Sequence, residues 1–152
     1  MIPRIYIDTS VVGGCFDKEY EKESTQLWRE FSRGKKIAVA SDLLLLELEE
    51  APARVRQLLN DLPADSVEYV LLDEESLALA NAYLQDGAVA ESSMADARHI
   101  AMATLARVDV LVSWNFKHIV NLNRIRRFNA VNLKLGYPTI EIRSPNEVLN
   151  ES

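Results

Sequence analysis

The sequence predicts an α/β fold, a three-layer α/β/α sandwich with a central, mainly parallel sheet. Three observations predict it: five short apolar runs rich in branched residues, helical patterns between them, and no internal repeat or linker that interrupts the alternation. Near-continuous apolar strands are typical of parallel sheets that are covered on both faces. At 152 residues the chain is expected to form a single domain, residues 1–152.

The strands are expected at residues 4–7, 37–40, 67–72, 110–113 and 139–142. The first helical pattern, residues 18–33, stops at Gly34, a residue type that commonly follows a helix end. Ser41 can cap a helix that begins at Asp42, and Pro52 separates that helix from a second one through Leu59.

Three further helices are expected in the second half of the chain. Asp73 can cap residues 74–85, and Ser92 or Ser93 can cap a helix through Arg107. Residues 117–135 are expected to be mostly helical, and Ser144-Pro145 to open a final short turn.

Two glycines near the start of the chain invite comparison with a phosphate-binding loop. Gly13-Gly14 lacks the downstream Gly-Lys-Ser/Thr of such a loop, so we expect a turn that needs positive φ instead.

Composition excludes several classes of protein. With 48% hydrophobic and 26% charged residues the chain has an ordinary globular composition, and no apolar run approaches the roughly 18 residues that span a membrane. The chain enters its first strand without the layout of a signal peptide. The single Cys15 cannot form an internal disulfide and is interpreted as a small buried residue. We therefore expect a cytoplasmic protein without a membrane partner.

Charge is unevenly distributed along the chain. The net charge of −6 argues against a general nucleic-acid coat protein, but residues 110–140 hold five basic residues and no acid. Residues 1–109 hold 11 Lys and Arg against 20 Asp and Glu. An acidic body with one basic segment is what a metal site beside a phosphate-binding surface needs; the alternative is a solvated basic helix face.

Acidic side chains occur where strands end and helices begin. Asp8 directly follows the first strand, where a carboxylate either caps a turn or binds a cation. Glu47 lies in SDLLLLELEE among leucines that are expected to face the core, so it is expected close to the sheet. Glu49 and Glu50 are expected in solvent, and the alternative places all three glutamates on one surface stripe.

Two further polar residues occupy comparable positions. Asp96 opens the pattern SSMADARHIAMATLAR, in which an acid of the first turn also suits the helix dipole. His99 lies one turn away on the same face and is interpreted as a packing or hydrogen-bonding residue rather than a ligand. Asn115 follows the strand at 110–113 as Asp8 follows its own strand, although Asn is also an ordinary turn residue.

Together these four positions predict a metal site. In an α/β fold ligands bind beyond the carboxyl ends of the strands, so Asp8, Glu47, Asp96 and Asn115 are expected at one edge of the sheet. Clustered carboxylates repel one another unless a cation offsets their charge, and hard oxygen ligands select Mg²⁺ or Mn²⁺. Such a site can activate water for in-line attack on a phosphodiester.

The residues resemble a PIN domain, the nuclease fold of the VapC-type ribonuclease toxins. The resemblance covers about residues 3–145 and rests on four blocks in order: IYIDTSVV, ASDLLLLELEE, ADARHIAMAT and DVLVSWNFKHI. It implies a PIN-like fold and a Mg²⁺- or Mn²⁺-dependent endoribonuclease with Asp8, Glu47 and Asp96 as catalytic metal ligands. It also implies frequent homodimers and, for the toxin branch, an antitoxin protein that blocks the site.

The fourth block departs from the family's pattern. Ser113-Trp114-Asn115 has Asn where the family usually has a fourth acid, which lowers the charge of the site from −4 to −3 and weakens a second metal ion more than the first. Asn115 still counts among the catalytic residues, because its amide offers a carbonyl oxygen. Thr9, Ser10 and Ser113 resemble the family's polar residues that orient the ligands.

Side chains of the basic segment are candidates for binding the RNA backbone. They are Lys117, His118, Arg124, Arg126 and Arg127. For His118 the alternative is a solvent-facing helix start. Trp114 and Phe116 are candidates for stacking a base, with at least one of them expected in the core.

The sequence therefore predicts a metal-dependent endoribonuclease that cleaves RNA phosphodiester bonds, the toxin component of a type II toxin–antitoxin system. The alternative from a different class is a PIN-fold protein that binds RNA or a partner with weak or no nuclease activity, because Asn115 weakens the acid set. An unrelated phosphoryl-transfer protein that uses Asp8 is disfavoured, since haloacid-dehalogenase-type phosphatases have a second Asp two residues on, where this chain has Ser10.

Overall fold

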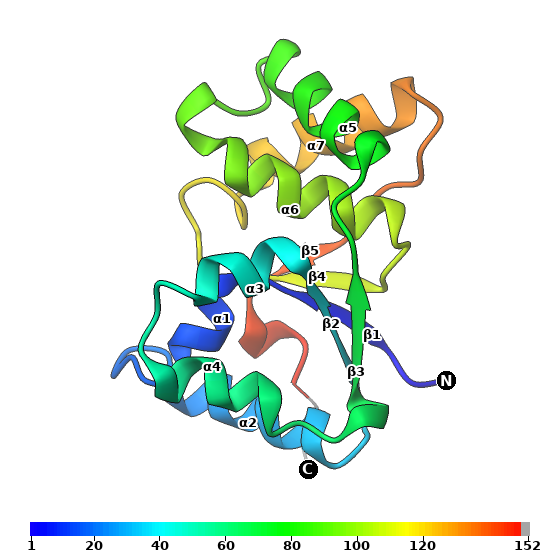
Figure 1. Cartoon of the computed structure of the whole chain (residues 1–152). Coiled ribbons are helices and arrows are strands. Elements are labelled where there is room, and N and C mark those ends of the chain that lie inside the picture. The colour runs from blue at the N-terminus through cyan, green and yellow to red at the C-terminus, as the bar shows by residue number, and fades with distance from the viewer. Residues whose placement is uncertain (150–152) are drawn as a thin grey trace.

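In a computed structural model, which describes residues 1–149, the chain forms a five-stranded sheet in which every neighbouring pair of strands is parallel. Helices cover both faces of this sheet (Figure 1), so the predicted three-layer sandwich is confirmed. The strands are β1 (Arg4–Ile7), β2 (Ile37–Ser41), β3 (Val67–Val70), β4 (Val110–Val112) and β5 (Ile142–Arg143), in the order β3-β2-β1-β4-β5.

Two groups of helices form the outer layers. Helices α5 (Glu74–Gln85), α6 (Met94–Leu105) and α7 (Leu122–Lys134) pack on one face. On the other face lie α1 (Thr9–Gly14), α2 (Glu21–Ser32), α3 (Asp42–Leu48) and α4 (Ala53–Asn60). The part of the chain that the structure describes also contains three short 3₁₀ helices: η1 (Ala64–Ser66), η2 (Glu91–Ser93) and η3 (Pro145–Glu147). None of the helices within residues 1–149 combines the length and the apolar composition of a membrane span.

Successive residues of each strand point to opposite faces of the sheet. Tyr6 packs in the core beneath α5, α6 and α7, whereas its neighbours Ile5 and Ile7 pack in the core beneath α1, α2 and α4. Leu111 and Val112 divide between the two cores in the same way. The strands read as continuous apolar runs because both of their faces are buried.

Several helix ends follow the predicted caps. Ser41 Oγ accepts from Leu44 N at 3.0 Å at the start of α3, and Asp73 Oδ1 accepts from Ser76 N at 2.8 Å at the start of α5. Gly34 follows α2 with a φ of +74°. The last long helix begins later than expected, because Asn121 caps α7 and residues 116–121 lie outside it.

The expected positive-φ turn at Gly13 and Gly14 is wrong. Both residues lie in α1, and neither has a positive φ. A Cβ atom at Gly14 would lie 2.5 Å from Ser24 Oγ and 2.8 Å from Trp114 Nε1, whereas one at Gly13 would meet no atom within 4 Å. Gly14 is therefore required by the close packing of α1 against α2 and Trp114.

The strand order reverses beside β1, because β2 and β3 extend to one side and β4 and β5 to the other. In open α/β sheets such a switch point, outside the carboxyl ends of the strands, is where ligands bind. A ligand-binding site is therefore expected at the residues that follow β1 and β4.

Gly14→Ala is expected to destabilise the fold by about 1–3 kcal/mol, because the added methyl group overlaps the hydrogen-bonded Ser24 hydroxyl and Trp114 indole. Gly13→Ala is the matched control and is expected to be neutral or stabilising by up to about 1 kcal/mol, since Ala favours a helix. Urea denaturation followed by circular dichroism measures both changes. Equal stability of the two variants would contradict the packing role of Gly14.

Candidate active site

Asp8 lies at the carboxyl end of β1, buried, where its side chain caps α1. Its Oδ1 accepts hydrogen bonds from Ser10 Oγ at 2.6 Å and Val11 N at 3.3 Å, and its Oδ2 accepts one from Ser113 Oγ at 2.6 Å. Burial raises the pKa of Asp8, although these hydrogen bonds oppose the shift. The structure thus brings Ser10 and Ser113, two of the predicted orienting residues, onto the Asp8 carboxylate.

Glu47 reaches the same edge of the sheet from α3. Its Oε1 accepts hydrogen bonds from Thr9 Oγ1 at 2.5 Å and from His99 Nε2 at 2.7 Å. Burial opposes the ionisation of this carboxyl group, but the hydrogen bonds from His99 and Thr9 outweigh burial and lower the pKa of Glu47. Thr9, the third predicted orienting residue, therefore contacts Glu47 rather than Asp8.

Asp96 projects from the first turn of α6 and is partly buried. Burial, followed by the nearby charge of Asp8, raises the pKa of Asp96. The Asp96 carboxylate accepts a long hydrogen bond of 3.5 Å from Asn115 Nδ2.

Asn115 combines a turn role with a position at the site. Its Oδ1 accepts from the backbone N of His118 at 3.0 Å, so the amide turns its nitrogen, not its oxygen, toward Asp96. The carbonyl oxygen that would bind a metal ion is therefore engaged in the turn after β4.

These side chains line one cavity of about 130 Å³. Its lining comprises Asp8, Thr9, Ser10, Glu47, Asp96, His99 and Asn115. The four predicted catalytic residues, separated by as many as 107 positions in the chain, are therefore brought together.

The donor set of the cavity can be compared with what a divalent cation requires. Among residues 1–149 no three or more His, Cys, Asp or Glu side chains are gathered as a ready-made metal site. Three carboxylates nevertheless line the cavity. The pKa of Asp96 is raised by burial and then by the charge of Asp8, and a cation in the cavity would relieve the repulsion between these two carboxylates. The chemistry of these oxygen donors fits Mg²⁺ or Mn²⁺.

His99 was interpreted from the sequence as a packing or hydrogen-bonding residue, and the structure places it in the lining of the cavity with contacts of that kind. It is buried, and besides Glu47 it contacts Tyr6, whose hydroxyl lies 2.6 Å from His99 Nδ1. The spacing of three residues from Asp96, which puts both on one helix face, was the available signal.

The basic side chains divide into two groups. Lys117 and Arg126 are exposed and, within residues 1–149, make no hydrogen bond to the loop between α5 and η2. Arg124, half-buried, and Arg127, exposed, each donate from Nη1 to a backbone carbonyl, of Ala88 at 2.7 Å and of Gly87 at 2.9 Å respectively. These two arginines therefore hold the loop between α5 and η2.

His118 is half-buried rather than solvent-facing. Its Nδ1 is buried and has no hydrogen-bond partner among residues 1–149. The positive charge of His118 opposes the rise in the pKa of Asp96.

The two aromatic residues after β4 have different environments. Trp114 is buried, donates from Nε1 to Ser24 Oγ at 2.8 Å, and stacks on Tyr20 with ring centroids 4.3 Å apart. Phe116 is 47% exposed, so it is the one of the pair whose ring is open to solvent. This agrees with the expectation that at least one of them packs in the core.

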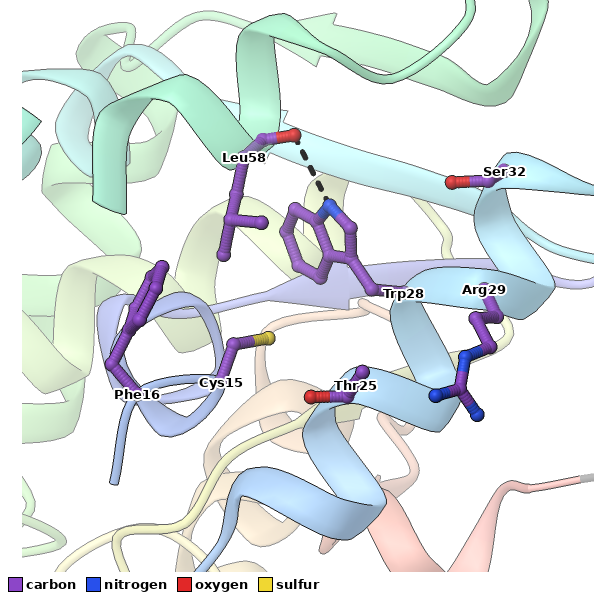
Figure 2. Close-up of a pocket in the computed structure, with 7 residues that line it drawn as sticks. All are labelled: Cys15, Phe16, Thr25, Trp28, Arg29, Ser32 and Leu58. Carbon is purple, nitrogen blue, oxygen red and sulfur yellow. Dashed lines mark hydrogen bonds between the residues drawn. The ribbon is translucent and has the colours of Figure 1, made fainter. Parts of the chain in front are cut away.

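A separate, mainly apolar cavity of about 300 Å³ lies among α1, α2 and α4 (Figure 2). Trp28 forms one wall and donates from Nε1 to the carbonyl oxygen of Leu58 at 3.1 Å. Cys15 lies in this cavity, where burial raises the pKa of its thiol to about 11 despite a hydrogen bond with Thr25. The thiol is protonated at neutral pH, as expected for a residue that packs rather than reacts.

No family model matches the chain, and no curated protein matches it. Solved structures share its architecture at low sequence identity. VapC20 from Mycobacterium tuberculosis, described as a sarcin-ricin loop cleaving toxin, has a TM-score of 0.57 at 15% identity over 75% of this chain and 92% of that chain.

Two further structures cover nearly the whole chain. VapBC2 from Rickettsia felis, bound to a DNA fragment from its promoter, has a TM-score of 0.60 at 11% identity over 93% of this chain and 98% of that chain. FitAcB from Neisseria gonorrhoeae has a TM-score of 0.56 at 13% identity over 95% of this chain and 99% of that chain. The parallel sheet, its two helical layers and these likenesses show that the chain has the PIN-domain fold of VapC-type proteins.

Proposed function

We propose that this chain is a Mg²⁺- or Mn²⁺-dependent endoribonuclease and the toxin component of a type II toxin–antitoxin system. The observation that carries the proposal is the convergence of Asp8, Glu47 and Asp96 on one cavity at the switch point of a PIN-fold sheet. The description of VapC20 as a toxin that cleaves the sarcin-ricin loop supports it.

In this proposal Asp8, Glu47 and Asp96 hold the metal ion. When bound, Mg²⁺ or Mn²⁺ polarises a phosphate oxygen and lowers the pKa of a bound water. Ser10 and Ser113 keep the Asp8 carboxylate in place through hydrogen bonds of 2.6 Å each.

Asp96 is the acid best suited to accept a proton from the attacking water. Burial is the main cause that raises its pKa and makes its carboxylate a stronger base than an exposed one, whereas the smaller effect of the Asp8 charge is one that a bound cation would offset. Its long hydrogen bond with Asn115, at 3.5 Å, constrains it less than the short bonds that hold Asp8 and Glu47.

The RNA backbone is proposed to run along the basic segment that follows β4. Lys117 and Arg126 have exposed side chains, and residues 110–140 contain no acid that would repel a phosphate. The positive charge of His118 acts on Asp96 of the cavity. Arg124 and Arg127 add positive charge as they hold the loop at residues 87–88.

An antitoxin protein and a second copy of the chain are the proposed partners. The likeness to VapBC2 and FitAcB supports an antitoxin. Exposed apolar side chains such as Leu46 on α3 and Leu71 after β3 are available for an interface between proteins.

One observation favours a second candidate function, a PIN-fold protein that binds RNA or a partner with weak or no nuclease activity. The Asn115 amide donates to Asp96 and directs its own oxygen to His118 N. The N–H group of the amide stabilises the negative charge of Asp96, which a cation would otherwise do, and Asn115 lacks the charge by which a fourth acid would attract that cation.

The wild-type protein is expected to cleave structured RNA in the presence of Mn²⁺ or Mg²⁺ and to lose this activity with a chelator. Asp8→Asn and Asp96→Asn are expected to lower the rate by about 100-fold or more, because each removes a charge from the cavity. Cleavage of end-labelled RNA on gels measures the rates.

The control for this experiment is Asp65→Asn, which changes an exposed acid in η1, before β3 and at the opposite edge of the sheet. It should keep the wild-type rate. Metal-independent cleavage, or full activity of both cavity variants, would overturn the catalytic assignment. Binding of Mn²⁺ without cleavage would favour the binding protein instead.

Asn115→Asp is expected to bind Mn²⁺ about tenfold more tightly than the wild type, because it adds a negative charge beside Asp96. The new carboxylate can still accept from His118 N, so the turn is expected to persist. Asn121→Asp makes the same change at the cap of α7 and should leave the affinity unaltered. Calorimetric titration measures both, and an unchanged affinity of the first variant would place position 115 outside the metal site.

Asp96→Asn is expected to raise the melting temperature of the metal-free protein near neutral pH. The folded state holds Asp96 at a pKa above the ordinary value of 3.8, because of burial and then the charge of Asp8, so its ionisation destabilises the fold as pH rises through that pKa. The gain should therefore vanish below about pH 4, where Asp96 is protonated in both states. Thermal denaturation with a chelator across this pH range measures it, and a gain independent of pH would rule out charge as its cause.

A further inference from the structure

A buried chain of hydrogen bonds leads from the acid cavity into the core. His99, only 3% exposed, donates from Nε2 to Glu47 Oε1 at 2.7 Å, and its Nδ1 lies 2.6 Å from the Tyr6 hydroxyl. The Tyr6 hydroxyl in turn donates to Ser41 Oγ at 2.9 Å. His99, Glu47, Tyr6 and Ser41 belong to α6, α3, β1 and β2 respectively. The hydrogen bonds therefore connect the sheet and a helix from each of its two faces to the Glu47 carboxylate.

The geometry of these bonds determines which oxygen of Glu47 is available. Thr9 and His99 both donate to Oε1, and they approach from α1 and α6 respectively. Within residues 1–149, Oε2 is thus the oxygen that remains for a ligand in the cavity that Glu47 lines. A glutamate side chain that is 30% exposed would otherwise turn among several rotamers.

We propose that His99 is a positioning residue that holds Glu47 Oε2 toward a cation in the cavity, with Tyr6 fixing the orientation of the imidazole ring. The inference rests on the proposed function, because the cation belongs to it. Partners that orient a metal ligand are commonly worth 10–100-fold in metal affinity.

Packing alone does not account for this arrangement. The rings of Tyr6 and His99 meet edge to face with centroids 5.7 Å apart, which an apolar aromatic residue could also achieve. An apolar ring, however, has no group that can hydrogen-bond. An imidazole can donate from one nitrogen to Glu47 while its second nitrogen bonds to the Tyr6 hydroxyl, and both nitrogens of His99 are used in this way.

The same helix offers a matched control. Thr104, 1% exposed and five residues beyond His99 on α6, donates to the carbonyl oxygen of Ile100 at 2.8 Å and lies 3.5 Å from the Tyr83 hydroxyl. It is a buried polar residue whose contacts do not include the acids. Thr104→Val therefore removes a buried hydroxyl from α6 without touching the cavity.

Calorimetric titration with Mn²⁺ alone tests the proposal on the wild type, His99→Leu, His99→Gln, Tyr6→Phe and Thr104→Val. His99→Leu is expected to weaken Mn²⁺ binding about 10- to 100-fold. His99→Gln, whose amide nitrogen can replace Nε2 as the donor to Glu47, is expected to recover most of the affinity. Tyr6→Phe should lose a few-fold, and Thr104→Val should keep the wild-type affinity even where its melting temperature falls.

A second readout separates positioning from general damage. Raising the Mn²⁺ concentration is expected to restore RNA cleavage by His99→Leu, because the variant still has Glu47, whereas Glu47→Gln should stay inactive. Cleavage by His99→Leu that does not recover at saturating Mn²⁺ would overturn the proposal.

The remaining outcomes are also decisive. Unchanged Mn²⁺ affinity in His99→Leu, or an equal loss in His99→Leu, His99→Gln and Thr104→Val, would overturn the positioning role alone. If His99→Leu fails to fold, Tyr6→Phe decides: weaker binding supports the role and wild-type binding overturns it. Absence of Mn²⁺ binding by the wild type would overturn the proposed function, and the inference with it.

Discussion

The parallel pairing of β1 with β4 is the constraint on which the acid cavity depends. Ile7 lies opposite Val112 in the ladder, so Asp8 and Ser113, 105 residues apart in the sequence, leave the sheet side by side and share a hydrogen bond of 2.6 Å. The strand order reverses at this pair, and α3 and α6 bring Glu47 and Asp96 to the same place. The site is therefore a property of the sheet's topology rather than of any one loop.

Three carboxylates in one small cavity repel one another, and the fold holds each of them by different means. Asp8 is buried and held by two hydroxyls and a backbone N–H. Glu47 is held in its ionised form by His99 and Thr9, which lower its pKa against the effect of burial. Asp96 keeps a raised pKa and a single long bond to an amide. The cluster thus has one firmly ionised member and two whose charge is opposed by burial, an imbalance typical of functional sites.

The position of the acids could be predicted from the sequence because the signals are local. An apolar run followed by Asp8, or an acid in the first turn before a small apolar face as at Asp96, is visible within a dozen residues. His99 was expected to pack or to hydrogen-bond, but Tyr6 could not be predicted as its partner, since the two residues lie 93 positions apart. Gly14 was misinterpreted for the same reason, because the indole that excludes a Cβ there belongs to Trp114. The start of α7 was predicted too early because Asn115 and Asn121 bind backbone N–H groups and divert the chain into turns.

Arg124 and Arg127 connect the last helix to the loop that leads into α6. The carbonyls of Ala88 and Gly87 that accept these bonds lie eight and nine residues before Asp96 in the chain. The consequence is a limit on what alanine scanning of the basic segment can reveal. Truncation of either arginine removes a hydrogen bond to the loop that leads to Asp96, and it also removes a surface charge. Weaker RNA binding by such a variant would therefore not identify a phosphate contact. Lys117 and Arg126, exposed on the surface, are the positions at which charge reversal reports on electrostatic attraction alone.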